Sequence, residues 1–267
     1  MMKRIDCHCH IYPDAIASRA VKGTGAFYDL PLVYRGTLSD LVSVHDAAGI
    51  SGGVIFSVAT TPHQAESINR FIAETARESG GRFLGLGTVH PDSETLKEDI
   101  EHIISLGLHG VKLHPDIQKF RVDSPKCMKI YELCEGRLPV LVHAGDHRYD
   151  FSNPRRLSSV LSVFPTLTVI GAHFGGWSVW DEAVGLLTSY KNFYVDTSSS
   201  LYALSPERAT EIIRAYGKER VLFATDYPMW RLDEELTRFA ALDLTEEEKE
   251  CIFYKNAERL FGCAIGA

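Results

Sequence analysis

Eight short apolar segments recur along this chain, and each is followed by a stretch whose apolar residues have helical spacing. Segments that are apolar on both faces and alternate with amphipathic helices are typical of a parallel sheet covered by helices. Eight such units, most with polar residues at their carboxyl ends, predict a closed (β/α)8 barrel of the TIM type rather than a doubly wound sheet. The predicted strands are 5–10, 53–58, 83–89, 110–115, 139–143, 167–173, 193–197 and 221–226.

The length of the chain fits one such barrel. At 267 residues it has room for eight units without a second domain, so we expect a single domain over 1–267. The tail from 245 to 262 predicts an extra C-terminal helix packed outside the barrel.

Charge and composition argue against several classes of function. The net charge is −7 and no basic tail is present, which disfavours a nucleic-acid partner. No apolar run is long enough to span a membrane, and no hydrophobic signal region follows the basic start. The six cysteines are scattered without a C-x-x-C pair, which is typical of the reducing cytoplasm. The oligomeric state stays open, with a homodimer as one option.

The first predicted strand contains two histidines two residues apart. Side chains alternate along a strand, so His8 and His10 are expected on one face, with Cys7 and Cys9 packed behind it. Two imidazoles on one face can hold a single metal ion.

Other histidines and an aspartate stand at the carboxyl ends of further predicted strands. These ends meet at one mouth of a barrel, where active sites lie. Imidazole and carboxylate groups are suitable ligands for zinc or a similar divalent ion. Besides His8 and His10, the strand-end residues are Lys112, His114, His143, His173 and Asp226.

This ordered set resembles the amidohydrolase superfamily. Within it, the chain is similar to amidohydrolase family 2, the branch that includes aminocarboxymuconate-semialdehyde decarboxylase and related lactone hydrolases. The resemblance spans the whole chain. It rests on the H-x-H of His8 and His10, on His143 and His173, on the turn at 225–228, on the segment 172–176 and on the tail Asn256–Phe261.

The resemblance implies one divalent metal, bound by His8, His10, His143 and Asp226. Asp226 either binds the metal or accepts a proton from the attacking water, and His173 orients or deprotonates that water. Zinc is the first choice of metal, with manganese and iron as alternatives because the same ligands suit each.

Two cationic residues are expected near the mouth. Lys112 corresponds to a strand-four lysine that is carboxylated and bridges two metals in some branches; an anion-binding or structural role is the alternative. Arg148, on the loop after His143, is a candidate anchor for a substrate carboxylate, and a salt bridge with Asp146 or Asp150 is its alternative. His114 is the other candidate substrate-binding residue.

The leading prediction is a metal-dependent hydrolase of a small amide, lactone or ester that bears a carboxylate. A non-oxidative decarboxylase on the same site is the alternative. A nuclease of the TatD type is disfavoured because Lys112 stands where that type has a glutamate. A non-enzymatic metal-binding or scaffold protein is also disfavoured, because every ligand position is filled. The anionic substrate follows from the positive charge of the metal, Lys112 and Arg148 in a concave site.

Two segments outside the strands carry specific predictions. The segment 12–36 contains glycines, prolines and aromatic residues and is expected to be a long irregular loop or lid. Thr37 is expected to cap a helix that Gly49 ends.

Overall fold

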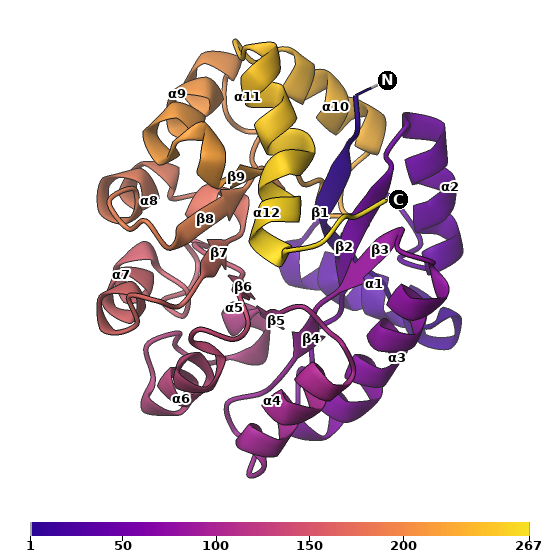
Figure 1. The fold of residues 1–267 in the computed structure, drawn as a ribbon, viewed down its shortest axis with the longest axis vertical. Coiled ribbons are helices and arrows are strands. Elements are labelled where there is room, and N and C mark those ends of the chain that lie inside the picture. The colour runs from indigo at the N-terminus through magenta and orange to yellow at the C-terminus, as the bar shows by residue number, and fades with distance from the viewer. Residues whose placement is uncertain (1, 267) are drawn as a thin grey trace.

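A computed structural model describes residues 2–266 of the chain. Its strands are all parallel and follow one another around a barrel, with helices outside (Figure 1). The predicted third strand is interrupted at Leu86, so that β3 pairs with β2 and β4 pairs with β5. Every predicted strand is confirmed. The strands are β1 (Ile5–His10), β2 (Gly52–Phe56), β3 (Phe83–Gly85), β4 (Gly87–Thr88), β5 (Val111–Leu113), β6 (Val140–Val142), β7 (Val169–Gly171), β8 (Phe193–Asp196) and β9 (Val221–Leu222).

Backbone hydrogen bonds connect the two sheets, β1–β3 and β4–β9, at both of their edges. The amide of Leu86 donates to the carbonyl of Ile55 at 3.0 Å, which continues the strand interrupted between β3 and β4. On the other side, the amide of Cys7 donates to Phe223 O at 2.9 Å, and that of His10 donates to Tyr227 O at 2.8 Å. The last strand unit therefore lies beside the first, as the predicted (β/α)8 barrel requires.

In β2, β3, β6, β7 and β9, successive apolar residues alternate between two separate clusters. On β6, Leu141 faces the barrel interior, while Val140 and Val142 pack under the helices. The interior is filled by side chains, as in other barrels of this size. The interior residues that lie in the strands or next to their ends are Ile5, Cys7, Val54, Phe56, Leu84, Leu86, Leu141, Ile170, Ala172, Leu222 and Ala224.

A bulge in β1 changes the direction of its side chains. The pairing of β1 with β2 shifts between Asp6 and Cys9. As a result, Cys7 packs in the barrel interior and Cys9 in the outer cluster. The prediction that both cysteines pack behind the strand is therefore wrong for Cys7, because strict alternation does not hold across a bulge.

Helices surround the strands in the order that the sequence predicts. Thr37 accepts a hydrogen bond from the Asp40 amide at the start of α2, and Gly49 ends that helix with φ of 67°. Both predictions for this helix are confirmed. The helices around the barrel are α2 (Leu38–Ala48), α3 (Ala65–Glu78), α4 (Leu96–Ser105), α6 (Pro125–Cys134), α7 (Pro154–Val163), α8 (Trp180–Leu187), α9 (Pro206–Tyr216) and α10 (Leu232–Ala240), with the short α5 (Pro115–Gln118) after β5.

The segment predicted as an irregular loop is mainly helical. Helix α1 (Asp14–Tyr28) begins after Pro13 and ends at Asp29, whose φ is 54°. The prediction of a long loop is wrong, since Gly23 and Gly25 both lie within the helix. Its position at the strand ends agrees with the expectation of a cover over the site.

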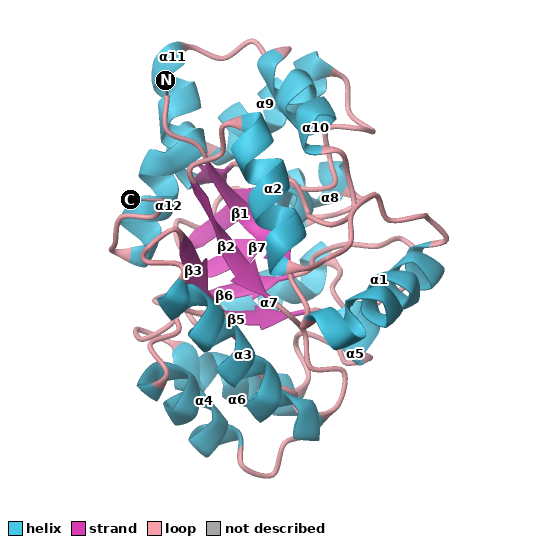
Figure 2. Cartoon of the chain, turned by 90° about the vertical axis from the view of Figure 1, so that its right-hand side faces the viewer, coloured by secondary structure: helices cyan, strands magenta, loops and turns pink. Residues whose placement is uncertain are grey.

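The C-terminal tail closes the opposite end of the barrel. It consists of α11 (Glu246–Glu250), a π-helical turn at Cys251–Lys255 and α12 (Asn256–Phe261), which confirms the extra helix. Ala257 and Ile265 join the interior cluster. Figure 2 shows α1 and α12 on opposite sides of the strands. Among residues 2–266, no helix has the length and apolar character needed to cross a membrane.

Candidate metal centre

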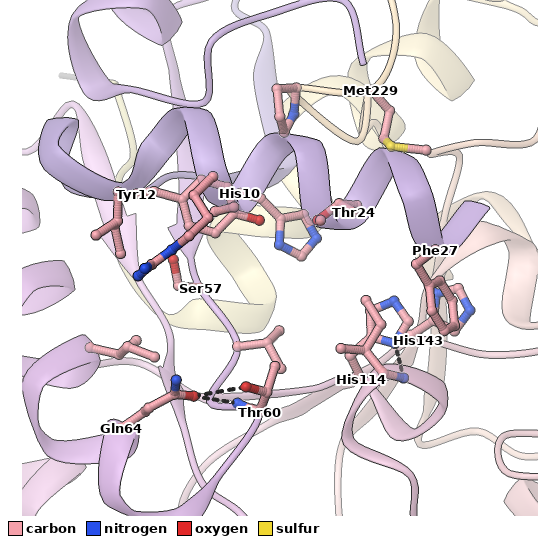
Figure 3. Close-up of a pocket in the computed structure, with 18 of the residues that line it drawn as sticks. His10, Tyr12, Thr24, Phe27, Ser57, Thr60, Gln64, His114, His143 and Met229 are labelled. Atoms are coloured by element: carbon pink, nitrogen blue, oxygen red, sulfur yellow. Dashed lines mark hydrogen bonds between the residues drawn. The ribbon is translucent and has the colours of Figure 1, made fainter. Parts of the chain in front are cut away.

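The carboxyl ends of the strands open into a cavity of about 630 Å³ between the barrel and α1 (Figure 3). Six predicted site residues line it, which confirms that the barrel brings them to one mouth; their functional roles stay predictions. Lys112 lies directly beneath this set and Arg148 lies outside the cavity wall. The six lining residues are His8, His10, His114, His143, His173 and Asp226.

Three side chains gather closely around one point. His8 Nε2 lies 3.2 Å from His10 Nε2 and 3.3 Å from Asp226 Oδ1, and the last atom is 3.8 Å from His10 Nε2. Two nitrogens that bind one tetrahedral zinc ion at its usual bond length lie about 3.3 Å apart. The observed spacing therefore suits a single shared ion.

A second carboxylate fixes the orientation of His8. Asp196 Oδ2 lies 2.8 Å from His8 Nδ1, and both side chains are buried. Because a carboxylate accepts, Nδ1 carries the hydrogen and Nε2 presents its lone pair to His10 and Asp226. Sequence reasoning missed Asp196, although it also ends a predicted strand and so carries the signal that identified Asp226.

Lys112 is a fully buried amine next to this cluster. Its Nζ lies 3.2 Å from His8 Nε2 and 4.9 Å from the centre of the Phe56 ring. Burial lowers its pKa to about 8, against the opposing effect of Asp196 and Asp226. An amine of this kind suits both predicted roles, since it can be cationic or neutral near pH 8.

Burial keeps the imidazoles of the site neutral. It lowers the pKa of His8 and of His10 well below the usual value, and the positive charge of Lys112 adds to the effect. It lowers the pKa of His173 to about 4. A neutral imidazole is the form that binds metals.

The hydrogen bonds of His173 define its tautomer. Its Nδ1 lies 3.0 Å from the carbonyl oxygen of Ser198, which can only accept, so Nδ1 carries the hydrogen. Its Nε2 therefore accepts from His143 Nδ1 at 3.0 Å. The φ of His173 is 60°, a region that residues other than glycine rarely adopt, and such strain is common at functional sites.

His143 is placed differently from the other predicted ligands. With Nδ1 donating to His173, its Nε2 has a free lone pair, and this buried atom has no hydrogen-bond partner among the described residues. It lies 3.4 Å from Asp116 Oδ2 and groups with Asp116 and His114 rather than with His8, His10 and Asp226. Burial raises the pKa of Asp116 to about 7.

Both ring nitrogens of His114 are engaged. Its Nδ1 accepts from the amide of Ile117 at 3.3 Å, and its Nε2 lies 2.8 Å from the Tyr28 hydroxyl of α1. Its ring stacks on that of His143, with the centroids 4.0 Å apart. His114 therefore connects α1 to the site and holds the ring of His143.

Arg148 is engaged outside the cavity. Its Nε and Nη2 donate to the two carboxylate oxygens of Asp146 at 2.9 and 2.7 Å, and its Nη1 donates to Phe27 O at 3.0 Å. The guanidinium also lies over the rings of Phe27, Tyr28 and other aromatic residues. This matches the predicted alternative of a salt bridge with Asp146, and Arg148 holds the end of α1 instead of facing the cavity.

Asp226 is supported by residues that sequence reasoning also missed. Ser199 donates a hydrogen bond to its Oδ2, and Trp230 Nε1 donates to Ser199 Oγ at 2.7 Å. Burial raises the pKa of Asp226 to about 7, against hydrogen bonding from Ser199 and the charge of Lys112. Its Oδ1 faces the two histidines.

The comparisons with known proteins identify the family. The family model described as amidohydrolase matches residues 5–263. This chain belongs to the amidohydrolase family. No match is found among curated proteins.

Solved structures share the fold over 98% of this chain. An uncharacterised TIM-barrel protein from Bordetella bronchiseptica is 25% identical, with a TM-score of 0.80 over 98% of this chain and 99% of that one. A dihydroxybenzoic acid decarboxylase from a Polaromonas species, with bound manganese and an inhibitor, is 17% identical, with a TM-score of 0.75 over 98% and 97%. A probable 2-pyrone-4,6-dicarboxylic acid hydrolase from Acinetobacter baumannii is 18% identical, with a TM-score of 0.70 over 98% and 100%.

On the outer side of the barrel, Asp6 connects the two chain segments that carry His8 and Asp226. Asp6 Oδ1 accepts from the amide of His8 at 3.2 Å and from the amide of Thr225 at 3.0 Å. One fully buried carboxylate thus connects the backbone of His8 with that of the residue before Asp226. Asp6 faces outward because it alternates with Ile5 and Cys7, which both pack in the barrel interior.

Proposed function

We propose that the protein is a metal-dependent hydrolase that acts on a small compound with a carboxylate and a hydrolysable carbonyl group. The observation that carries the proposal is the meeting of His8 Nε2, His10 Nε2 and Asp226 Oδ1 at the wall of a large cavity. These atoms are spaced as the ligands of one ion are, and imidazoles with a carboxylate are ligands that a divalent metal prefers.

His8, His10 and Asp226 form the core of the proposed metal site. We add His143 as the further ligand because its Nε2 is buried and has no partner among residues 2–266. Zinc is the metal that we propose, because neutral imidazoles with a carboxylate are its usual ligands, and manganese or iron suits the same set. When bound, the metal would polarise the substrate carbonyl and lower the pKa of a coordinated water.

The protein residues around the metal would handle the proton of the attacking water. Asp226 is the proposed acceptor of that proton, because its carboxylate lies at the metal site, with Oδ1 towards the histidines and Oδ2 accepting from Ser199. Asp226 would then return the proton to the leaving group. His173 is the second proposed proton-transfer residue, and the lone pair of its Nε2 accepts from His143 Nδ1. The charge of Lys112 would stabilise negative charge on the substrate.

A decarboxylase is the second candidate, and the mainly apolar lining of the cavity favours it. Apolar side chains from α1, α3 and α5 line much of the cavity, such as Ile16, Phe71 and Ile117. Poor solvation of a carboxylate in such surroundings favours its loss.

Product analysis in isotopically labelled water tests both reactions. The zinc-loaded and manganese-loaded protein is incubated with a panel of carboxylated lactones, amides and aromatic acids. Hydrolysis is expected to place one oxygen-18 atom from water in a new carboxylate, without release of carbon dioxide. Release of carbon dioxide with a solvent deuterium on the product carbon would establish the decarboxylase instead. Activity that survives complete removal of metal would overturn both proposals.

A further inference from the structure

One face of α1 forms the roof of the cavity. The residues of α1 that line it recur at intervals of three and four, which is the spacing of a single helix face. This face includes one charged residue, Arg19. The lining residues of α1 are Ile16, Arg19, Ala20, Gly23, Thr24, Phe27 and Tyr28.

Arg19 lines the cavity at a position exposed to solvent and is a cation without a counter-ion. Within the described chain it makes no ion pair or side-chain hydrogen bond, unlike Arg148, which is paired with Asp146. Among the residues that line the cavity, Arg19 is the sole lysine or arginine and Asp226 the sole acidic residue. A guanidinium in a concave, mainly apolar wall attracts an anion, because the local field decides what enters a cleft.

Gln64 offers a second donor to the same cavity. Its carbonyl oxygen accepts from the amide of Thr60 at 2.8 Å, from Thr60 Oγ1 at 3.0 Å and from the amide of Thr61 at 3.2 Å. These three bonds fix the side chain and leave its amide nitrogen, which can only donate, without a partner among residues 2–266. Figure 3 shows Gln64 and Thr60 at one end of the cavity and His114 and His143 towards the other.

We propose that Arg19 and Gln64 form an anion subsite that binds a carboxylate of the substrate away from the metal centre. The ligand class is a two-ended acid. Its reacting group faces His8 and His10, its body lies against Ile68 and other apolar residues of the wall, and a second carboxylate meets Arg19. The subsite deepens the proposed function and relies on it for the identity of the reacting end.

Binding to the metal-free protein tests the subsite independently of any reaction. The probes are para-fluorobenzoate and its neutral analogue para-fluorobenzamide, and fluorine NMR measures the binding of each. Arg19→Met is expected to weaken the benzoate about tenfold, as for loss of one charge-assisted contact, and to change the benzamide less than twofold. Arg19→Lys should retain part of the affinity. Gln64→Glu, which keeps the carbonyl acceptor and adds a negative charge, should also weaken the benzoate selectively.

Two further variants make the result decisive. Lys22→Met removes a charge from the same helix at a position that is exposed, as Arg19 is, but does not line the cavity, so it should leave the binding of both probes unchanged. Lys112→Met distinguishes the two ends of the site. If Lys112→Met weakens the benzoate and Arg19→Met does not, the anion binds beside the metal centre and the subsite is overturned. Circular dichroism and thermal melting confirm that each variant is folded.

Steady-state kinetics tests the anion subsite separately from the proposed reaction. With an active substrate, Arg19→Met should raise KM about tenfold for the two-ended acid and leave kcat within twofold, since Arg19 binds without touching the reacting atoms. If the enzyme turns over none of the panel but the selective loss of benzoate is observed, the subsite stands alone. If hydrolysis is found but Arg19→Met binds both probes as tightly as the wild type does, only the subsite is wrong.

Discussion

Asp196 Oδ2 lies 2.8 Å from Nδ1 of His8, and both side chains are buried. The same carboxylate receives the amide hydrogen of His173 on Oδ1 at 2.9 Å. One residue therefore orients a proposed metal ligand and fixes the backbone of the proposed proton-transfer residue. Carboxylates that hold the second nitrogen of a metal-binding histidine increase the basicity of the ligand and fix its tautomer.

Replacement of Asp196 by asparagine is expected to weaken metal binding by about 10–100-fold without unfolding the protein. The amide keeps the size of the side chain but loses the charge that holds the hydrogen on His8 Nδ1. Competition with a zinc-binding dye measures the affinity. Asp233→Asn, at an exposed ion pair with Arg231, is the matched control and should bind zinc like the wild type. Equal affinities for the wild type and Asp196→Asn would contradict the role of Asp196.

Protein purified without chelators is expected to hold about one equivalent of a divalent metal, as a mononuclear site requires. His8→Ala and His10→Ala should each lose it, because each removes one of the clustered nitrogens. Elemental analysis by mass spectrometry measures the content. Two equivalents in the wild type that fall in Lys112→Ala would show instead that Lys112 is carboxylated and bridges a pair of metals.

His173→Asn is expected to retain the metal and to lower kcat by about 10²–10⁴-fold, the usual effect of losing a positioned acid or base. In the structure the Nε2 of His173 meets His143, and it is not part of the cluster around His8 and His10. Metal content and steady-state rates are measured on the same preparation. Loss of the metal in this variant would place His173 among the ligands.

The barrel could be predicted from the sequence because buried strands and amphipathic helices alternate eight times. Helix α1 could not, because it packs over a cavity instead of the core and buries only one residue, Ala17. The sequence of α1 therefore has no wide apolar stripe, and the glycines and prolines in this segment indicate a loop. The register of β1 after Asp6 was also beyond prediction, since a bulge depends on the pairing with β2.

The candidate site could be located from the sequence because its residues stand at the carboxyl ends of strands, which meet at one mouth of the barrel. Six of the predicted residues line the cavity there. Individual partners could not be located in this way. Arg148 is close to His143 in sequence, yet its side chain turns to Asp146 and the end of α1. Arg19 could not be recognised until α1 was known to cover the mouth. Side-chain direction depends on packing that strand order alone does not specify.

Gly23→Ala is expected to stabilise the metal-free protein by about 0.5–1 kcal/mol. Gly23 lies inside α1, its φ is not in the left-handed region, and an added Cβ would meet no atom within 4 Å. Alanine therefore restricts the unfolded chain and gains helix propensity without a clash. Urea unfolding measures the change. Gly107→Ala also has open space but has a φ of 73°, so this control should be destabilised. Destabilisation by Gly23→Ala would show that the helix is strained at this point.

Glu235 of α10 is expected to make the protein less stable as the pH rises. It is fully buried, with Oε1 2.5 Å from Arg238 Nη1 and Oε2 without a partner among the described residues. Burial raises its pKa from 4.5 to about 7, against the effect of Arg238. The folded state therefore holds the proton more tightly than the unfolded state. Its contribution to stability is fully present below pH 4.5 and is lost as the pH rises to about 7.

Glu235→Gln removes this titration and keeps the size of the side chain. Between pH 5 and 7 the free energy of unfolding of the wild type should fall relative to that of the variant, by at most ~1.4 kcal/mol per pH unit for one titrating group. Urea unfolding of the metal-free proteins across this range measures the difference. Glu234→Gln removes an exposed partner of the same Arg238, so its pH profile should run parallel to that of the wild type. A parallel profile for Glu235→Gln as well would mean that Glu235 stays ionised in the fold, paired with Arg238.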